Sequence, residues 1–190
     1  YYGPLNGQTV SFYDRTSFLG TAVTDHNGTA VYILANPGAD THLFTARFGG
    51  DPQNNNAETS VSNPYTIHKG LQADLLVGGV PSSITYGDAS FTLSHSGGSG
   101  MNDTYSFYSN SPDVLSVDPN GTVNIINAGT AVITVTKAGD DNYNPIMKDI
   151  AVKVAPKILN LCITPNNKPY DATVDATVKT IDYAGVVGTD

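Results

Sequence analysis

The sequence predicts an all-β chain built from tandem β-sandwich modules, and three observations support this prediction. The chain has 21 Thr but only one Glu and three Gln, so strand-favouring residues are abundant and helix-favouring ones are scarce. It also has 19 Gly and 11 Pro, which place turn residues at short intervals. Two short phrases recur in the same order about 90 residues apart, which indicates one structural plan used twice.

The recurring phrases are expected to form turns and loops. The first is Asp-x-Asn-Gly-Thr, at residues 25–29 and 118–122, and the second is a Gly-Asp pair with Asn close behind, at residues 50–54 and 139–144. The two phrases are 26 residues apart in the first copy and 22 in the second, counted from Asp to Asp. An Asn-Gly pair between β-rich runs predicts a hairpin, because both residues tolerate positive φ.

The first module is expected at residues 1–69. It lacks counterparts of the strands that open the second module, which predicts an N-terminally truncated sandwich with Val10 near an unprotected sheet edge. Its predicted strands span residues 9–13, 19–24, 29–34, 42–48 and 60–67.

A complete second module is expected at residues 70–156, followed by the opening strands of a C-terminally truncated third module at residues 157–190. The short junctions at residues 67–70 and 155–157 predict modules held end to end with little freedom. Predicted strands in the second module span residues 71–77, 82–86, 89–94, 104–109, 114–117, 122–126, 131–137 and 148–154, and those in the third span 158–164 and 177–181.

Charge and hydropathy limit the possible partners. The net charge is −8, from 17 acidic and nine basic residues, so the surface should repel phosphate backbones and nucleic acid is not an expected partner. No apolar run is long enough to predict a membrane span. The chain begins with Tyr1-Tyr2 and no signal-peptide pattern, which we interpret as an internal fragment of a longer protein.

Calcium binding is the sharpest chemical alternative for the loops. Carboxylates and amides in the two Gly-Asp loops are oxygen ligands of the kind that Ca²⁺ prefers. The competing interpretation is that Asp and Asn side chains bond to their own backbone in turns, and the dense Asp-x-Asp-x-Asp-Gly pattern is lacking. The candidate ligands are Asp51, Asn54, Asp140, Asp141, Asn142 and Asn144.

Other candidate chemistry is weak. The scattered histidines form no Ser-His-acid pattern or Gly-x-Ser-x-Gly elbow. Tyr105 and Tyr108 should point to opposite faces of one strand, so they form no platform for sugar stacking. Glu58 is the one Glu that could promote a Lys–Asn cross-link, and Cys162 should be a buried strand residue without a disulfide partner. The histidines are His26, His42, His68 and His95, and the glycosylation sequons begin at Asn27, Asn102 and Asn120.

Several stretches resemble known bacterial repeats. Residues 7–67 resemble the bacterial Ig-like repeats of long surface proteins, and residues 71–155 look like a related bacterial Ig-like module. Residues 158–190 are similar to the opening of the repeat named for its Tyr-Asp-Gly motif, although Ala172 replaces the Gly. The matching stretches are Gly7–Tyr13, Leu19–Ala22, Asn27–Ala30, Thr45–Asp51, Ile84–Asp88, Asn127–Ala131, Gly139–Tyr143 and Lys168–Thr173.

The resemblance implies an extracellular protein, attached to the cell surface or wall, with adhesive or spacer duties and without catalytic residues. We therefore expect a structural stalk segment of an adhesin-type protein, not an enzyme, with no catalytic, cofactor-binding or metal-binding residues. Neighbouring repeats of the same chain are its expected partners. The alternatives are an Ig-like module that binds a glycan or host protein, and an accessory module of a large secreted enzyme. An exposed apolar patch larger than about 400 Å² would favour binding.

Overall fold

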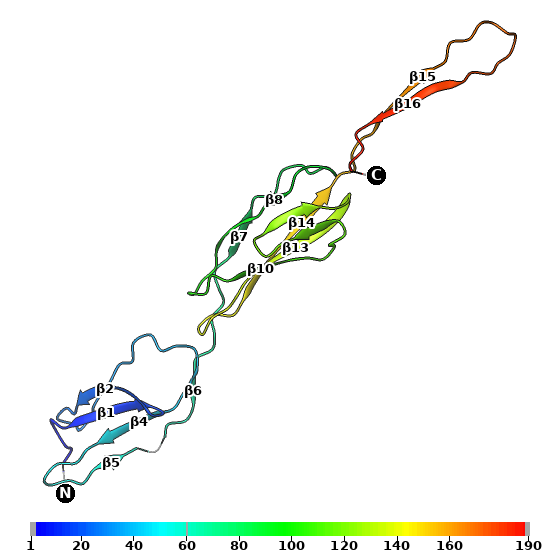
Figure 1. Ribbon diagram of the computed structural model, residues 1–190. Helices are drawn as coiled ribbons and strands as arrows, with labels where there is room; N and C mark the ends of the chain where they lie inside the picture. Colours follow the sequence, from blue (N-terminus) through cyan, green and yellow to red (C-terminus); the bar gives the residue numbers. More distant parts are fainter. Residues whose placement is uncertain (1–2, 60, 189–190) are drawn as a thin grey trace. The chain divides into compact units, whose positions relative to one another are not determined.

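The computed structural model describes residues 3–59 and 61–188, which form strands and loops without any helix (Figure 1). The all-β prediction is therefore confirmed. The chain divides into two compact units: unit 1 comprises Tyr1–Gln72 and Gly139–Asn144, and unit 2 comprises Ala73–Ala138 and Pro145–Asp190. The Gly139–Asn144 loop thus belongs to unit 1, although its sequence lies in the second repeat. The described part of the chain has no helix that is long and apolar enough to cross a membrane.

Unit 1 contains a four-stranded antiparallel sheet in the order β2-β1-β4-β5 and a separate pair formed by β3 and β6. The chain changes sheets at Leu43, because β4 pairs with β1 whereas β3, just before it, pairs with β6. The strands are β1 (Thr9–Asp14), β2 (Ser17–Val23), β3 (Thr41–His42), β4 (Phe44–Phe48), β5 (Ala57–Glu58) and β6 (Tyr65–Thr66).

Two expectations for unit 1 are wrong. Val10 lies on an interior strand, paired with Ala22 of β2 and Phe48 of β4, because β4 returns to cover the side of β1 that the sequence seemed to leave open. Residues 29–34 form no strand; instead Tyr32 stacks on Phe12 with 5.5 Å between ring centroids. Of the predicted strand at 60–67, only β6 forms among the described residues, and Ser60 lies outside them.

Unit 1 is held by partly buried aromatic rings, not by a fully buried core. None of the apolar residues among its described residues is buried, whereas the polar residues Thr24, His42 and Thr45 are. Phe44 contacts the rings of both His42 and Tyr65, at centroid distances of 5.6 and 6.4 Å. Polar contacts therefore carry an unusually large share of the packing in this unit.

Unit 2 contains a β-sandwich. One sheet has the order β10-β13-β14, the facing sheet has the order β11-β12-β8, and β7 pairs with β9. The predicted strand at 82–86 is reduced to a bridge between Thr85 and Ala155. The strands are β7 (Leu75–Gly78), β8 (Phe91–Thr92), β9 (Ser94–Gly97), β10 (Tyr105–Ser109), β11 (Leu115–Val117), β12 (Thr122–Ile125), β13 (Gly129–Lys137) and β14 (Ile146–Val154).

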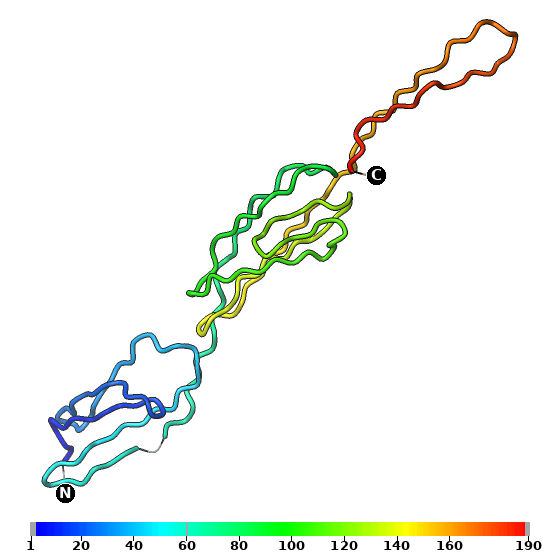
Figure 2. Tube along the Cα trace, viewed as in Figure 1, coloured from blue at the N-terminus to red at the C-terminus, as the bar shows by residue number. Residues whose placement is uncertain are grey.

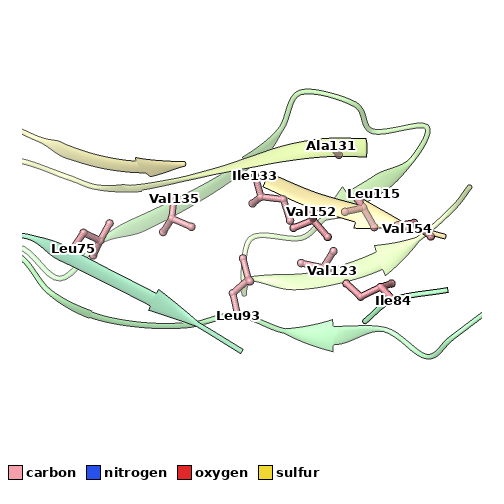
Figure 3. Close-up of a cluster of buried hydrophobic side chains, with 10 residues drawn as sticks. All are labelled: Leu75, Ile84, Leu93, Leu115, Val123, Ala131, Ile133, Val135, Val152 and Val154. Carbon is pink, nitrogen blue, oxygen red and sulfur yellow. The ribbon is translucent and has the colours of Figure 1, made fainter. Parts of the chain in front are cut away.

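Alternation along β13 explains the sandwich core. Ala131, Ile133 and Val135 point inward from every second position, as expected for a strand with one buried face. Leu115 and Val123 meet them from the facing sheet, and both are completely buried (Figure 3). The full buried cluster is Leu75, Ile84, Leu93, Leu115, Val123, Ala131, Ile133, Val135, Val152 and Val154.

After the sandwich, β15 (Asn160–Pro165) and β16 (Val178–Ala184) run side by side as an extended antiparallel hairpin (Figure 2). Apolar and polar cross-strand pairs lie on opposite faces of the hairpin. Leu161 pairs with Tyr183, and one face of the hairpin is apolar, whereas Cys162 pairs with Asp182 on the other face. All residues of both strands are exposed, so the expectation that Cys162 is buried is wrong.

The buried position of Leu115 yields the first prediction. Leu115→Ala should lower the free energy of unfolding of unit 2 by about 2–5 kcal/mol, because a completely buried side chain leaves a cavity. The matched control is Leu76→Ala on β7, where the side chain is 65% exposed and the change should stay within about 0.5 kcal/mol. Denaturant unfolding followed by tyrosine fluorescence measures both. Equal losses in the two variants would contradict the core assignment.

Candidate functional site

The Asp-x-Asn-Gly-Thr phrase forms the same turn in both units. In unit 1, Asp25 Oδ1 accepts hydrogen bonds from the backbone N–H of Asn27 at 2.8 Å and of Thr29 at 2.9 Å. The backbone adds two more bonds, from Gly28 N to Asp25 O and from Asp25 N to Thr29 O, both at 2.9 Å. Around Asp118 in unit 2 the equivalent four bonds measure 2.8–3.0 Å.

The glycine of this phrase is required by the turn geometry. Its φ is +77° in the first copy and +81° in the second, a region that residues with a Cβ rarely adopt. In unit 2 the turn joins β11 to β12, which confirms the predicted hairpin. In unit 1 the turn forms as predicted, but the chain leaves it as a loop.

The Gly-Asp phrase also forms one motif twice. Asp51 Oδ1 accepts hydrogen bonds from Gln53 N and Asn54 N, and its own N–H donates to Asn54 O. Asp140 repeats this arrangement: its Oδ1 accepts from the N–H groups two and three residues on, both at 2.9 Å, and its own N–H donates to the carbonyl three residues on. Both phrases are therefore short Asp-capped loops.

These bonds account for two of the three carboxylates that were candidate calcium ligands, those of Asp51 and Asp140. The side-chain amide of Asn54 is the first cause that holds the pKa of Asp51 below its ordinary value, and the backbone N–H of Thr122 does the same for Asp118. The described residues contain no group of three or more His, Cys, Asp or Glu side chains placed to hold a metal ion. The turn interpretation thus explains the positions of the Asp51 and Asp140 side chains.

The Gly139–Asn144 loop makes further contacts within unit 1. Asn142 Oδ1 accepts a 2.8 Å hydrogen bond from Ala39 N, and Gly70 pairs with Tyr143 in a short parallel bridge. Lys69 Nζ donates to the carbonyl of Asp140 at 2.6 Å. A loop read from sequence as a simple turn is therefore also bound to the Pro37–Asp40 turn and to residues 69–72.

A partly buried acid–histidine pair lies on the other side of the Pro37–Asp40 turn. Nδ1 of His42 lies 2.7 Å from Oδ2 of Asp14, and its Nε2 lies 3.1 Å from the carbonyl oxygen of Gly38. Oδ1 of Asp14 accepts a 2.9 Å hydrogen bond from Leu43 N, at the residue where the chain changes sheets. Sequence reasoning listed His42 only among scattered histidines. The one available signal was that His42 lies two residues before Phe44 on a predicted strand, on the same face. This signal could not reveal Asp14 as its partner.

The electrostatics of this pair have clear causes. The hydrogen bond to Asp14 is the first cause that raises the pKa of His42, followed by the bond to the Gly38 carbonyl. Burial by itself would raise the pKa of Asp14, but the bonds from His42 and Leu43 N lower it on balance. Each partner therefore favours the charged form of the other.

The other histidines lie apart from one another. His26 lies in the Asp25–Thr29 turn, and His68 precedes the loop contacts at Lys69. His95 on β9 stacks on Tyr105 at a centroid distance of 3.9 Å. Tyr105 packs against the core whereas Tyr108 is exposed, so the two rings share no face, as predicted.

The remaining candidates have structural roles or are exposed. Glu58 forms an exposed ion pair with Arg47, with Nε and Oε1 3.0 Å apart. Asn102 Oδ1 accepts a hydrogen bond from Thr104 N, so its sequon lies in a turn. Lys137 was not among the residues singled out from the sequence; it occupies the last inward-facing position of β13 and is buried. Its Nζ lies 3.0 Å from Oδ1 of Asp103.

Comparison with protein families gives one match. The model of the immunoglobulin-like domain of intimin matches residues 86–139, within the second repeat. This supports the bacterial Ig-like resemblance for that repeat. The match does not extend to residues 157–190, where the similarity to the Tyr-Asp-Gly repeat stays a prediction. No curated protein matches the chain.

Three solved structures are similar to the chain. The C-terminal 282-residue fragment of intimin, in complex with the intimin-binding domain of the translocated intimin receptor, is 22% identical over 86% of this chain and 56% of that one, with a TM-score of 0.31. Domains 1–6 of the surface layer protein SbsC are 17% identical over 86% of this chain and 29% of that one, with a TM-score of 0.35. Domains 4 and 5 of SbsC are 18% identical over 83% and 56%, with a TM-score of 0.26. The chain thus spans about half of the intimin fragment.

The Asp-capped turns predict a strict preference for Asp over Glu. Asp118→Glu and Asp118→Ala should each lower the melting temperature of unit 2 by a few degrees, because the longer or missing side chain cannot accept from Asn120 N and Thr122 N. Asp118→Asn keeps an acceptor and should have a smaller effect. Calorimetry measures all three, with Asp113→Glu at an exposed position of the same unit as the control. A melting temperature unchanged in Asp118→Ala would show that the carboxylate does not stabilise the turn.

Proposed function

We propose that the chain is a structural repeat segment, a stalk or spacer, of a bacterial cell-surface protein of the adhesin type. Its role is mechanical: it carries neighbouring domains away from the surface and has no enzymatic activity of its own. The proposed location is extracellular, at the cell surface or in the cell wall. Its proposed partners are neighbouring repeats of the same chain.

The observation that carries this proposal is the duplication of the two Asp-capped motifs. The turns around Asp25 and Asp118 share four equivalent hydrogen bonds, and the loops at Asp51 and Asp140 share three. In both motifs the Asp carboxylate accepts hydrogen bonds from backbone N–H groups of its own turn. These side chains therefore have a structural role. Repetition of a structural motif without a repeated reactive group is what a spacer requires.

The family match supports the surface assignment. Residues 86–139 match an Ig-like domain named for intimin, and they include most of the sandwich core of unit 2. This core is filled by aliphatic side chains on strands paired over as many as nine residues, as between β13 and β14. Such a sandwich suits a protein that must keep its fold outside the cell.

We further propose that residues 157–190 are the opening strands of a third module. In the hairpin, Leu161 and Ile163 share a face with Ile181 and Tyr183, and all four are more than half exposed. An isolated two-stranded hairpin is marginally stable in water, and an apolar face of this kind normally packs against a second sheet. The alternative is that this face binds a glycan or host protein directly.

A replacement experiment tests the spacer role. In the natural surface protein, exchanging residues 1–156 for unrelated Ig-like modules of equal number should leave adhesion of the intact cells unchanged, because a spacer contributes length and not contacts. Antibodies against the segment should bind intact cells. The control is deletion of the same residues, which should reduce adhesion by shortening the projection. Loss of adhesion on exchange would instead assign binding to these modules.

Limited proteolysis tests the third module. In the 190-residue chain, trypsin should cleave after Lys179 on β16 much faster than after Lys148 on β14, because β16 pairs with β15 alone among the described strands whereas β14 is paired over nine residues with β13 in the sandwich. In the longer natural protein, cleavage after Lys179 should slow to the rate at Lys148. Equally fast cleavage after Lys179 in both proteins would contradict a third sandwich and favour an open binding face.

A further inference from the structure

The contacts of His42 require a doubly protonated ring. A backbone carbonyl oxygen can only accept a hydrogen bond, and an ionised carboxylate likewise has no proton to donate. Nε2 of His42 faces the carbonyl of Gly38 at 3.1 Å, and Nδ1 faces Asp14 at 2.7 Å. Both ring nitrogens must therefore carry hydrogen for both bonds to exist, and only the imidazolium form has two.

The turn that His42 holds is also the turn that holds the Gly139–Asn144 loop. Gly38 accepts from His42, and the next residue, Ala39, donates its N–H to Asn142 Oδ1 at 2.8 Å. These two bonds lie on consecutive residues of the short Pro37–Asp40 turn. A change at the Gly38 carbonyl therefore acts directly on the peptide group whose N–H binds Asn142.

We propose that His42 is a proton-dependent lock. As the imidazolium it holds the Pro37–Asp40 turn against β1, and loss of its proton weakens the hydrogen bond from Ala39 N to Asn142 Oδ1. On deprotonation, one ring nitrogen loses its hydrogen and carries a lone pair instead. If Nδ1 keeps its proton for Asp14, Nε2 then presents that lone pair to the lone pairs of the Gly38 carbonyl, so a hydrogen bond is replaced by repulsion.

The charged surroundings favour the protonated form of His42. Asp14 on β1 and Asp40 in the turn both stabilise the imidazolium. Arg15 pairs with Asp40 at 3.1 Å, and its positive charge also lowers the pKa of Asp14, which favours the ionised form of that carboxylate. The other titratable groups close to His42 are Lys69 and Asp141, which line the same hollow, and Tyr65, its partner on β6.

The sign of the pH dependence follows from the two pKa directions. The pKa of His42 is raised in the folded protein, so its contribution is complete below the ordinary histidine value of about 6.5 and is lost as pH rises through the folded value. The pKa of Asp14 is lowered, so its contribution is present above about 3.9 and is lost only as pH falls through its folded value. Unit 1 should therefore be most stable between about pH 4 and 6.5, and less stable in alkaline solution.

The test is NMR of the 190-residue chain between pH 5 and 9. Long-range ¹⁵N–¹H spectra should show both nitrogens of His42 protonated at pH 5–6, with a midpoint above the ordinary histidine value of about 6.5. Over the same range the protection factor of the Ala39 amide against hydrogen exchange should fall severalfold. Reciprocal linkage adds that Asn142→Ala should lower the midpoint of His42.

Variants separate the lock from a general pH effect. His42→Gln can still donate to one acceptor but cannot titrate, so the protection factor of Ala39 should become independent of pH. His26→Gln, a matched change at an exposed histidine of the same unit, should keep the dependence of the unchanged protein. If His42→Gln fails to fold, the titration of the unchanged chain still decides. A His42 midpoint at or below about 6.5, or a constant Ala39 protection factor, would overturn the proposal.

Discussion

The structure depends on one recurrent interaction, the acceptance of backbone N–H groups by Asp side chains where the β-ladder ends. Asp14, Asp25, Asp51, Asp118 and Asp140 each accept one or two such bonds. The side chain must be short to reach the backbone a few residues away, which favours Asp over Glu at these five positions. Part of the negative charge of the chain thus comes from how its turns are built.

The two units achieve order in different ways. Unit 2 buries ten aliphatic side chains between its sheets, so its strands are positioned by packing. Unit 1 has no fully buried apolar side chain among its described residues and relies on ring contacts and on the pair of Asp14 and His42 at the sheet change. An order that rests on an ion pair responds to solution conditions, whereas one that rests on aliphatic packing hardly does.

The sequence was most informative where a local pattern determines the structure. The alternation that ends at Lys137 predicted β13, and the Asp-x-Asn-Gly-Thr phrase predicted both turns. The sequence was uninformative where contacts between residues far apart in the chain determine the structure. Nothing near Val10 shows that β4 returns to cover it, and nothing near His42 shows Asp14, which is 28 residues away. Tyr32 lies in a segment predicted as a strand, yet its ring packs on Phe12 and the segment forms no β-ladder.

The Asp-capped turns also affect the chemical ageing of the chain. An Asn followed by Gly is the dipeptide most exposed to deamidation, in which the glycine nitrogen attacks the asparagine side chain, closes a five-membered imide and expels ammonia. In both copies that nitrogen already donates to the carbonyl of the preceding Asp, at 2.9 and 3.0 Å. The folded turn thus restrains the attacking atom, and Asn27 and Asn120 are protected by the hydrogen bonds that their own sequence phrase creates.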